Sequence, residues 1–138
     1  MSTTWSWYAD AGGTVPLTRG DFARGSVSAA VDRIVYFMSP ATGKKLQRAT
    51  LPGTNALQVK IDDVASGSGV EVANIKLALS SGGLGSATGG AALSIGTTLL
   101  SGAAGAVAVF VRLTSAITAA GNYDDAGLYV EDYLETDV

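Results

Sequence analysis

The clearest structural signal in this chain is the stretch Ala106-Val-Ala-Val-Phe-Val-Arg-Leu113, in which the side chains alternate. Successive side chains of a strand point to opposite faces, so a period of two gathers one set of residues on a single side. Four branched apolar residues share such a side here: Val107, Val109, Val111 and Leu113. The sequence therefore predicts a strand over 106–113 whose branched apolar face is buried.

Similar patterns recur along the rest of the chain. Residues 57–62 place Leu57, Val59 and Ile61 on one face, and Ile75, Leu77 and Leu79 are in phase within 70–79. Gly and Pro punctuate the runs, since Gly supplies positive φ and Pro presets a turn. The predicted strands besides 106–113 cover residues 31–38, 57–62, 70–79, 93–99 and 128–134, with shorter ones near 5–8 and 15–17.

These strands predict the fold class. No window has sustained helical periodicity, and the best helix candidate, 26–32, is too short. Short strands separated by frequent turns are typical of a sandwich or barrel. We expect residues 1–138 to form a single all-β domain. Its predicted architecture is one antiparallel β-sandwich of about seven to nine strands, immunoglobulin-like or jelly-roll.

A turn near the end of the chain bears on the immunoglobulin-like option. Residues 117–124 end in Gly121-Asn-Tyr123-Asp, which is similar to the turn before a late strand of many immunoglobulin-like sandwiches. There the Tyr hydroxyl ties the corner back to the backbone. The alternative, that Tyr123 is simply an aromatic residue at the start of a strand, stays open.

Composition excludes several function classes. The 138-residue chain has no Cys and no His, so disulfides, thiolate chemistry and ordinary Ser–His catalysis are ruled out. Its 9 basic and 12 acidic residues leave no basic excess for nucleic acid. Charged residues make up only 15%, which favours either a surface made for protein contacts or a neutral Gly/Ala/Ser surface.

The sequence also bears on membranes and export. The segment from Leu77 to Val111 carries no charge, but Gly and Ser interrupt it, so we expect no transmembrane helix. The N-terminus lacks the basic and apolar regions of a secretory signal, and we expect synthesis in a cytoplasm.

No residue pattern predicts catalysis, a cofactor or a metal. The acid pairs lack a calcium-loop spacing, and the Gly82–Gly90 segment lacks the Lys of a phosphate-binding loop. The Arg19-Gly20-Asp21 tripeptide is interpreted as a turn rather than as a cell-adhesion signal. Residues 124–137 hold six acids and no base; they either dock on a basic partner or protect an edge strand from pairing.

Two segments are candidates for contact with partner proteins. An N-terminal aromatic arm (residues 1–12) would anchor in a neighbour as interface hot spots do, or its aromatic residues would simply cover the end of the sandwich. The 82–90 loop would become ordered against a neighbour. The candidate contact residues are Trp5, Trp7, Tyr8, Gly82, Gly83, Leu84 and Gly85.

The Gly/Ala/Thr-rich second half resembles small β-sandwich structural proteins of tailed bacteriophages. The resemblance covers 93–102, 106–112 and 119–124. It implies a non-enzymatic virion component made in the host cytoplasm, most simply a head-decoration (cement) protein that binds the major capsid protein as a trimer or dimer. The alternatives are a tail, baseplate or fibre component, or a carbohydrate-binding or adhesion domain that uses exposed aromatic residues.

Overall fold

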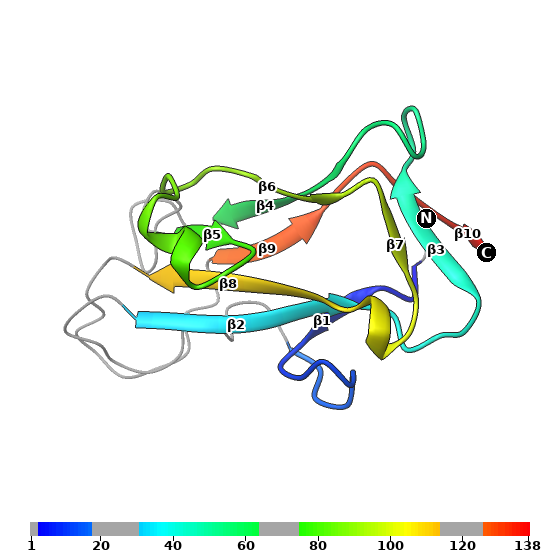
Figure 1. Ribbon diagram of the computed structural model, residues 1–138, viewed down its shortest axis with the longest axis horizontal. Helices are drawn as coiled ribbons and strands as arrows, with labels where there is room; N and C mark the ends of the chain where they lie inside the picture. Colours follow the sequence, from blue (N-terminus) through cyan, green and yellow to red (C-terminus); the bar gives the residue numbers. More distant parts are fainter. Residues whose placement is uncertain (1–2, 18–30, 64–74, 114–125) are drawn as a thin grey trace.

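The chain forms antiparallel β-structure throughout the part described by the computed structural model, residues 3–17, 31–63, 75–113 and 126–138 (Figure 1). These residues contain ten strands and the short 3-10 helices η3 (Gly82–Gly85) and η4 (Ala103–Gly105). The all-β prediction is confirmed. Within these ranges, no helix has the length and apolar character needed to span a membrane. The predictions for Arg19-Gly20-Asp21 and Tyr123 lie outside the described residues.

A four-stranded sheet contains the longest strand, β2. Its order is β1-β2-β8-β5, with bounds β1 (Ser6–Tyr8), β2 (Val31–Met38), β8 (Val107–Leu113) and β5 (Ile75–Ala78). The β2–β8 pairing places Val31 opposite Leu113 and Phe37 opposite Val107. The strands predicted over 31–38 and 106–113 are therefore confirmed almost to the residue.

Two three-stranded sheets complete the described structure. One has the order β10-β3-β7, with β10 (Tyr133–Asp137), β3 (Lys44–Arg48) and β7 (Thr98–Leu100). The other has the order β6-β4-β9, with β6 (Leu93–Gly96), β4 (Leu57–Asp63) and β9 (Ala126–Val130). The predicted strand 57–62 is confirmed as β4.

Bends divide two segments that the sequence predicts as single strands. The 93–99 segment becomes β6 and β7, and Gly96, the last residue of β6, has φ of 112°. The 128–134 segment becomes β9 and β10, and Asp132 before β10 has φ of 54°. A positive φ takes the backbone out of the extended region, so each strand leaves one sheet and enters the other at this point.

One hydrophobic core receives residues from all three sheets. Its fully buried members include Val109 and Val111 from β8, Leu46 from β3 and Val59 from β4. The predicted phase of β5 holds for Ile75 and Leu77, which are buried. It fails for Leu79, which lies beyond the end of the strand with 53% of its surface exposed.

Strand β3 has no counterpart among the predicted strands. Its sequence, Lys-Lys-Leu-Gln-Arg, holds one apolar residue, Leu46, and that residue is 0% exposed. β3 is the central strand of its sheet, between β10 and β7, so its main-chain groups are paired on both sides.

Candidate functional site

The predicted contact residues of the N-terminal segment divide between two faces of the four-stranded sheet. Trp7 points inward, where its ring lies 4.8 Å from that of Phe37 between centroids, tilted by 42°. Trp5 is only 4% exposed and belongs to the core. Tyr8, the next residue along β1 after Trp7, faces the opposite way and pairs with Tyr36. Of these three residues, only Tyr8 lies on the outer face of the sheet.

The Gly82–Gly85 segment, expected as a loop that a neighbour would order, forms η3 against β5 and β8 (Figure 1). Leu84 is 0% exposed yet stands apart from the main core cluster. A Cβ on Gly83 would lie 3.2 Å from that of Ala78, which alternation places on the outer face of β5. Gly82 and Gly85 are exposed, and η3, to which they belong, packs on the outer face of β5 through Gly83.

An apolar patch lies on this outer face between β1 and β8. The register places Tyr8, Tyr36 and Ala108 in one row across the sheet, and Ile34 and Phe110 in the next. Ile34 is 44% exposed, and the other four are partly exposed. We call these five residues the outer patch. A cluster of apolar and aromatic side chains on a sheet face is typical of a protein contact surface.

Local structure borders the outer patch on two sides. The turn after β1 folds over Met38, which is 1% exposed, and Gly13 there has φ of 71°. A Cβ on Gly13 would lie 2.8 Å from Met38 Cε, the flexible end of that side chain, so the positive φ favours glycine here more than this contact does. η3 covers the β5 side at Ala78, which is 6% exposed. The chain thus buries the margins of this face and leaves its centre open.

Charged residues occupy the next row of the same face. Arg112 Nε and a terminal nitrogen donate to the two carboxylate oxygens of Asp32, at 2.8 and 3.1 Å. The hydrogen bond from Arg112 lowers the pKa of Asp32 below its ordinary value, and the same bond raises the pKa of Arg112. Lys76 lies opposite Arg112 across β5 and β8, so the described residues of this row are two bases and one acid, Asp32.

The acid-rich C-terminal segment is paired with bases of the same chain. Glu131 contacts Lys60 of β4, and Asp137 contacts Lys44 of β3. Arg48 Nε donates to Asp132 at 2.9 Å and lowers the pKa of that carboxyl. Three of the four acids from 131 onward therefore have basic partners on the adjacent strands. The sequence left two interpretations of these acids open, docking on a basic partner and protection of an edge strand. Pairing with bases on neighbouring strands of the same chain is a third.

The fourth acid, Glu135, anchors the start of the described chain. Its Oε1 accepts hydrogen bonds from the Thr4 backbone N–H at 2.7 Å and from the Thr4 and Thr3 hydroxyls at 2.8 and 3.0 Å. Burial acts to raise the pKa of Glu135, but the hydrogen bonds from Thr4 and Thr3 outweigh it and leave the pKa lowered. Residues 3 and 4 are thus tied to β10, next to a pocket.

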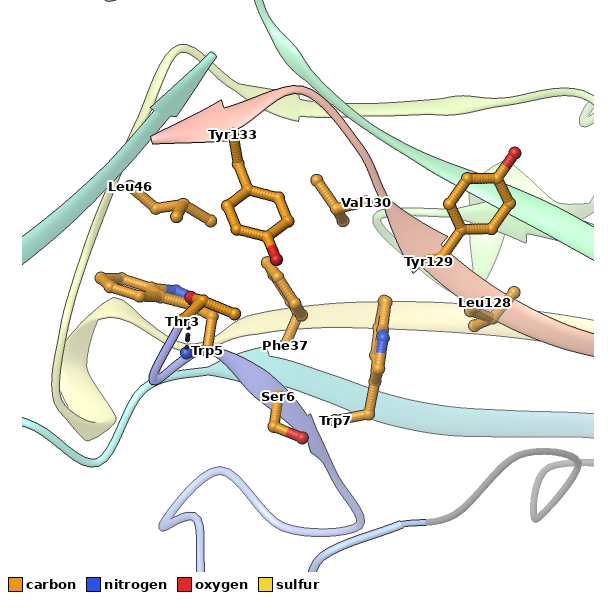
Figure 2. Close-up of a pocket in the computed structure, with 10 residues that line it drawn as sticks. All are labelled: Thr3, Trp5, Ser6, Trp7, Phe37, Leu46, Leu128, Tyr129, Val130 and Tyr133. Carbon is orange, nitrogen blue, oxygen red and sulfur yellow. Dashed lines mark hydrogen bonds between the residues drawn. The ribbon is translucent and has the colours of Figure 1, made fainter. Parts of the chain in front are cut away.

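This pocket is lined mainly by aromatic and aliphatic side chains and has a volume of about 180 Å³. Figure 2 shows Trp5, Trp7 and Phe37 on one side of it, with Tyr133 and Val130 facing them from β10 and β9. Thr3, Ser6, Leu46, Leu128 and Tyr129 complete the lining. The indole Nε1 of Trp5 is buried and has no hydrogen-bond partner. We call this site the aromatic pocket.

Within the four described ranges, no group of three or more His, Cys, Asp or Glu side chains could hold a metal ion. Sequence reasoning found Trp5, Trp7 and Tyr8 but did not find Ile34, Tyr36 and Phe110 as a surface group, nor Tyr133 as a pocket residue. Alternation within 31–38 and 106–113 was the available signal for the surface group.

No protein-family model, curated protein or solved structure matches this chain.

Proposed function

We propose that this protein is a non-enzymatic structural component of a tailed-bacteriophage particle, a head-decoration protein that binds the major capsid protein. The outer patch is the observation that carries the proposal. Its five apolar residues lie on the face of a regular sheet, and a rigid, partly exposed apolar face is suited to stable contact with another protein. The exposed glycines of η3, Gly82 and Gly85, widen the contact area on this face.

The proposed mechanism is stabilisation of a shell by many identical contacts. Burial of apolar surface contributes about 25 cal/mol per Å², before the costs of association. Contacts repeated in a multimer strengthen one another because the second contact of a linked pair is effectively intramolecular. A dimer or trimer that spans neighbouring capsid subunits would use this effect to hold the shell together.

The proposed fold for this role is a single β-sandwich. β6 and β7 follow one another in the sequence across a bend, and so do β9 and β10. β4 lies between β6 and β9 in one sheet, and β3 lies between β7 and β10 in the other. Counted through the bends, the β6-β4-β9 and β7-β3-β10 orders describe one bent layer of three long strands. With the four-stranded sheet this gives seven strands (4 + 3), and the shared core supports their packing face to face.

The experiment is binding of purified protein to empty capsids of the tailed phage that encodes it. We expect saturable binding at a fixed number of copies per capsid subunit and a raised capsid melting temperature. Ile34→Gln should weaken binding at least tenfold while leaving the free protein folded. The matched control is Leu100→Gln, which alters an equally exposed residue (52% against 44%) on a different sheet.

Two results would overturn the proposal. One is capsid binding that is equal in Ile34→Gln and Leu100→Gln. The other is recovery of the protein on purified tails and never on heads, which would assign it to the tail, baseplate or fibres.

A further inference from the structure

We propose that the aromatic pocket binds a prolyl residue within an extended segment of another protein. The proposal is independent of capsid binding, because the pocket lies between β1 and the β9–β10 edge, away from the outer patch. The argument depends on the size of the pocket, on the polarity of its lining and on the unpaired donor of Trp5.

Size limits the ligand to a single ring or side chain. Pockets for drug-sized ligands and cofactors measure roughly 300–1,000 Å³. The aromatic pocket, at about 180 Å³, is below that range. This space would not enclose a nucleotide or another large cofactor, whereas the five-membered ring of proline is within it.

The polarity of the lining argues against charged ligands and sugars. None of the described residues that line the pocket is Asp, Glu, Lys or Arg, so a phosphate, carboxylate or ammonium group would meet no counter-charge among them. A sugar ring would stack on the tryptophans, but each buried hydroxyl needs a hydrogen-bond partner. Thr3, Ser6, Tyr129 and Tyr133 supply hydroxyls, but none of the described lining residues carries a carboxylate or carboxamide to bind paired sugar hydroxyls.

A prolyl segment matches both the apolar lining of the pocket and the Trp5 donor. Its ring is apolar, it lacks a backbone N–H, and its carbonyls act only as acceptors. The indole Nε1 of Trp5 acts only as a donor, and it is buried without a partner. An unpaired buried donor is unfavourable, so a carbonyl that reaches it gains a hydrogen bond at little desolvation cost. Polyproline segments are also extended before binding and lose little entropy.

Access to the Trp5 donor requires a small rearrangement. Trp5 is 4% exposed, and its Nε1 is closed off from water in the ligand-free protein. The ligand must therefore displace side chains of the pocket rim as it enters. Tyr133 lines the pocket and is only partly buried, and in Figure 2 its ring faces Trp5 and Phe37, so an incoming segment contacts this ring directly.

The test is an NMR titration of the isolated, full-length, ¹⁵N-labelled protein with an acetylated and amidated decaproline peptide. The chain has two tryptophans, so two indole N–H signals are expected, and Trp5→Phe assigns them. We expect the Trp5 signal to move downfield and to saturate. A peptide of equal length in which alanine replaces proline should bind at least roughly tenfold more weakly.

Variants distinguish the pocket from non-specific adhesion of the peptide. Tyr133→Leu, which keeps an apolar side chain but removes the ring, should weaken decaproline binding several-fold, whereas Leu79→Ser, which alters an exposed residue that does not line the pocket, should leave it unchanged. The proposal is overturned if decaproline leaves both indole signals unmoved. It is equally overturned if the alanine peptide binds as well, or if free glucose, galactose or N-acetylglucosamine shifts the Trp5 signal and decaproline does not.

Discussion

Replacement of Leu46 by alanine tests the packing of β3, the strand with the least apolar sequence. Leu46 is 0% exposed and is the single apolar side chain that β3 contributes to the core. The change removes three buried carbon atoms, worth about 0.8 kcal/mol each in transfer free energy, and measured costs of such substitutions start near 2.7 kcal/mol. Because Leu46 borders the aromatic pocket, water and side-chain movement limit the cavity term. We expect a loss of about 3 kcal/mol.

The assay is urea denaturation followed by tryptophan fluorescence, with thermal melting as a second readout. An unfolding entropy of about 2.1 cal/mol/K per residue over the 138 residues converts the expected loss to a fall of about 10 °C in Tm. Lys45→Ala is the matched control, because the neighbouring side chain faces the other way; it should change stability by less than about 0.5 kcal/mol. Equal effects of the two substitutions would refute the described packing of β3.

Two further predictions concern backbone fit and acid stability. Gly105→Ala should destabilise the fold by at least about 2 kcal/mol, since the new Cβ would lie 1.9 Å from the Leu100 carbonyl oxygen. The control is Gly82→Ala, whose new Cβ meets no atom within 4 Å and should leave Tm unchanged. Equal melting curves of the two variants would contradict this prediction. Hydrogen bonds from Arg48 and Lys44 lower the pKa values of Asp132 and Asp137, respectively, in the folded protein. Each ion pair therefore stabilises the fold fully above the unfolded-state pKa of Asp, near 3.9. This stabilisation is lost as the pH falls from there through the lower folded-state pKa. Urea midpoints measured from pH 6 down to 2 should therefore fall, and Arg48→Gln should make the fall shallower; an unchanged slope in the variant would be inconsistent with the described pairing.

The sequence predicted those strands whose side chains alternate without interruption. In 106–113 and 31–38 the apolar period is strong, and β8 and β2 follow it closely. β3 was missed because Lys44, Lys45 and Arg48 surround a single leucine, and its position between two other strands depends on pairing that no local pattern shows. Tertiary context decides such a strand.

The bends and the acidic segment could not be predicted for a related reason. Asp132 adopts a positive φ that its residue type only weakly favours, and the bend depends on β9 and β10 joining different sheets. The acids at 131–137 were interpreted without basic partners, because Lys60 and Arg48 are more than seventy residues away from them in the chain. Once β3 and β4 are placed, the pairing follows from the register.

The candidate sites were predicted in part. Strand alternation places Trp5 and Trp7 on one face, and both line the aromatic pocket. It also separates Tyr8 from them, onto the outer patch, although the three residues were predicted together as partner contacts. The buried position of Leu84 in η3 could not be predicted, because a glycine-rich stretch gives no periodic signal.

Electron cryomicroscopy of the proposed phage particle tests the proposed function most directly. We expect density for the β-domain on the outer surface of the head, at positions repeated with the capsid lattice, with Ile34 and Phe110 facing the major capsid protein. Heads without such density, or a domain whose outer patch faces solvent in the particle, would contradict the account.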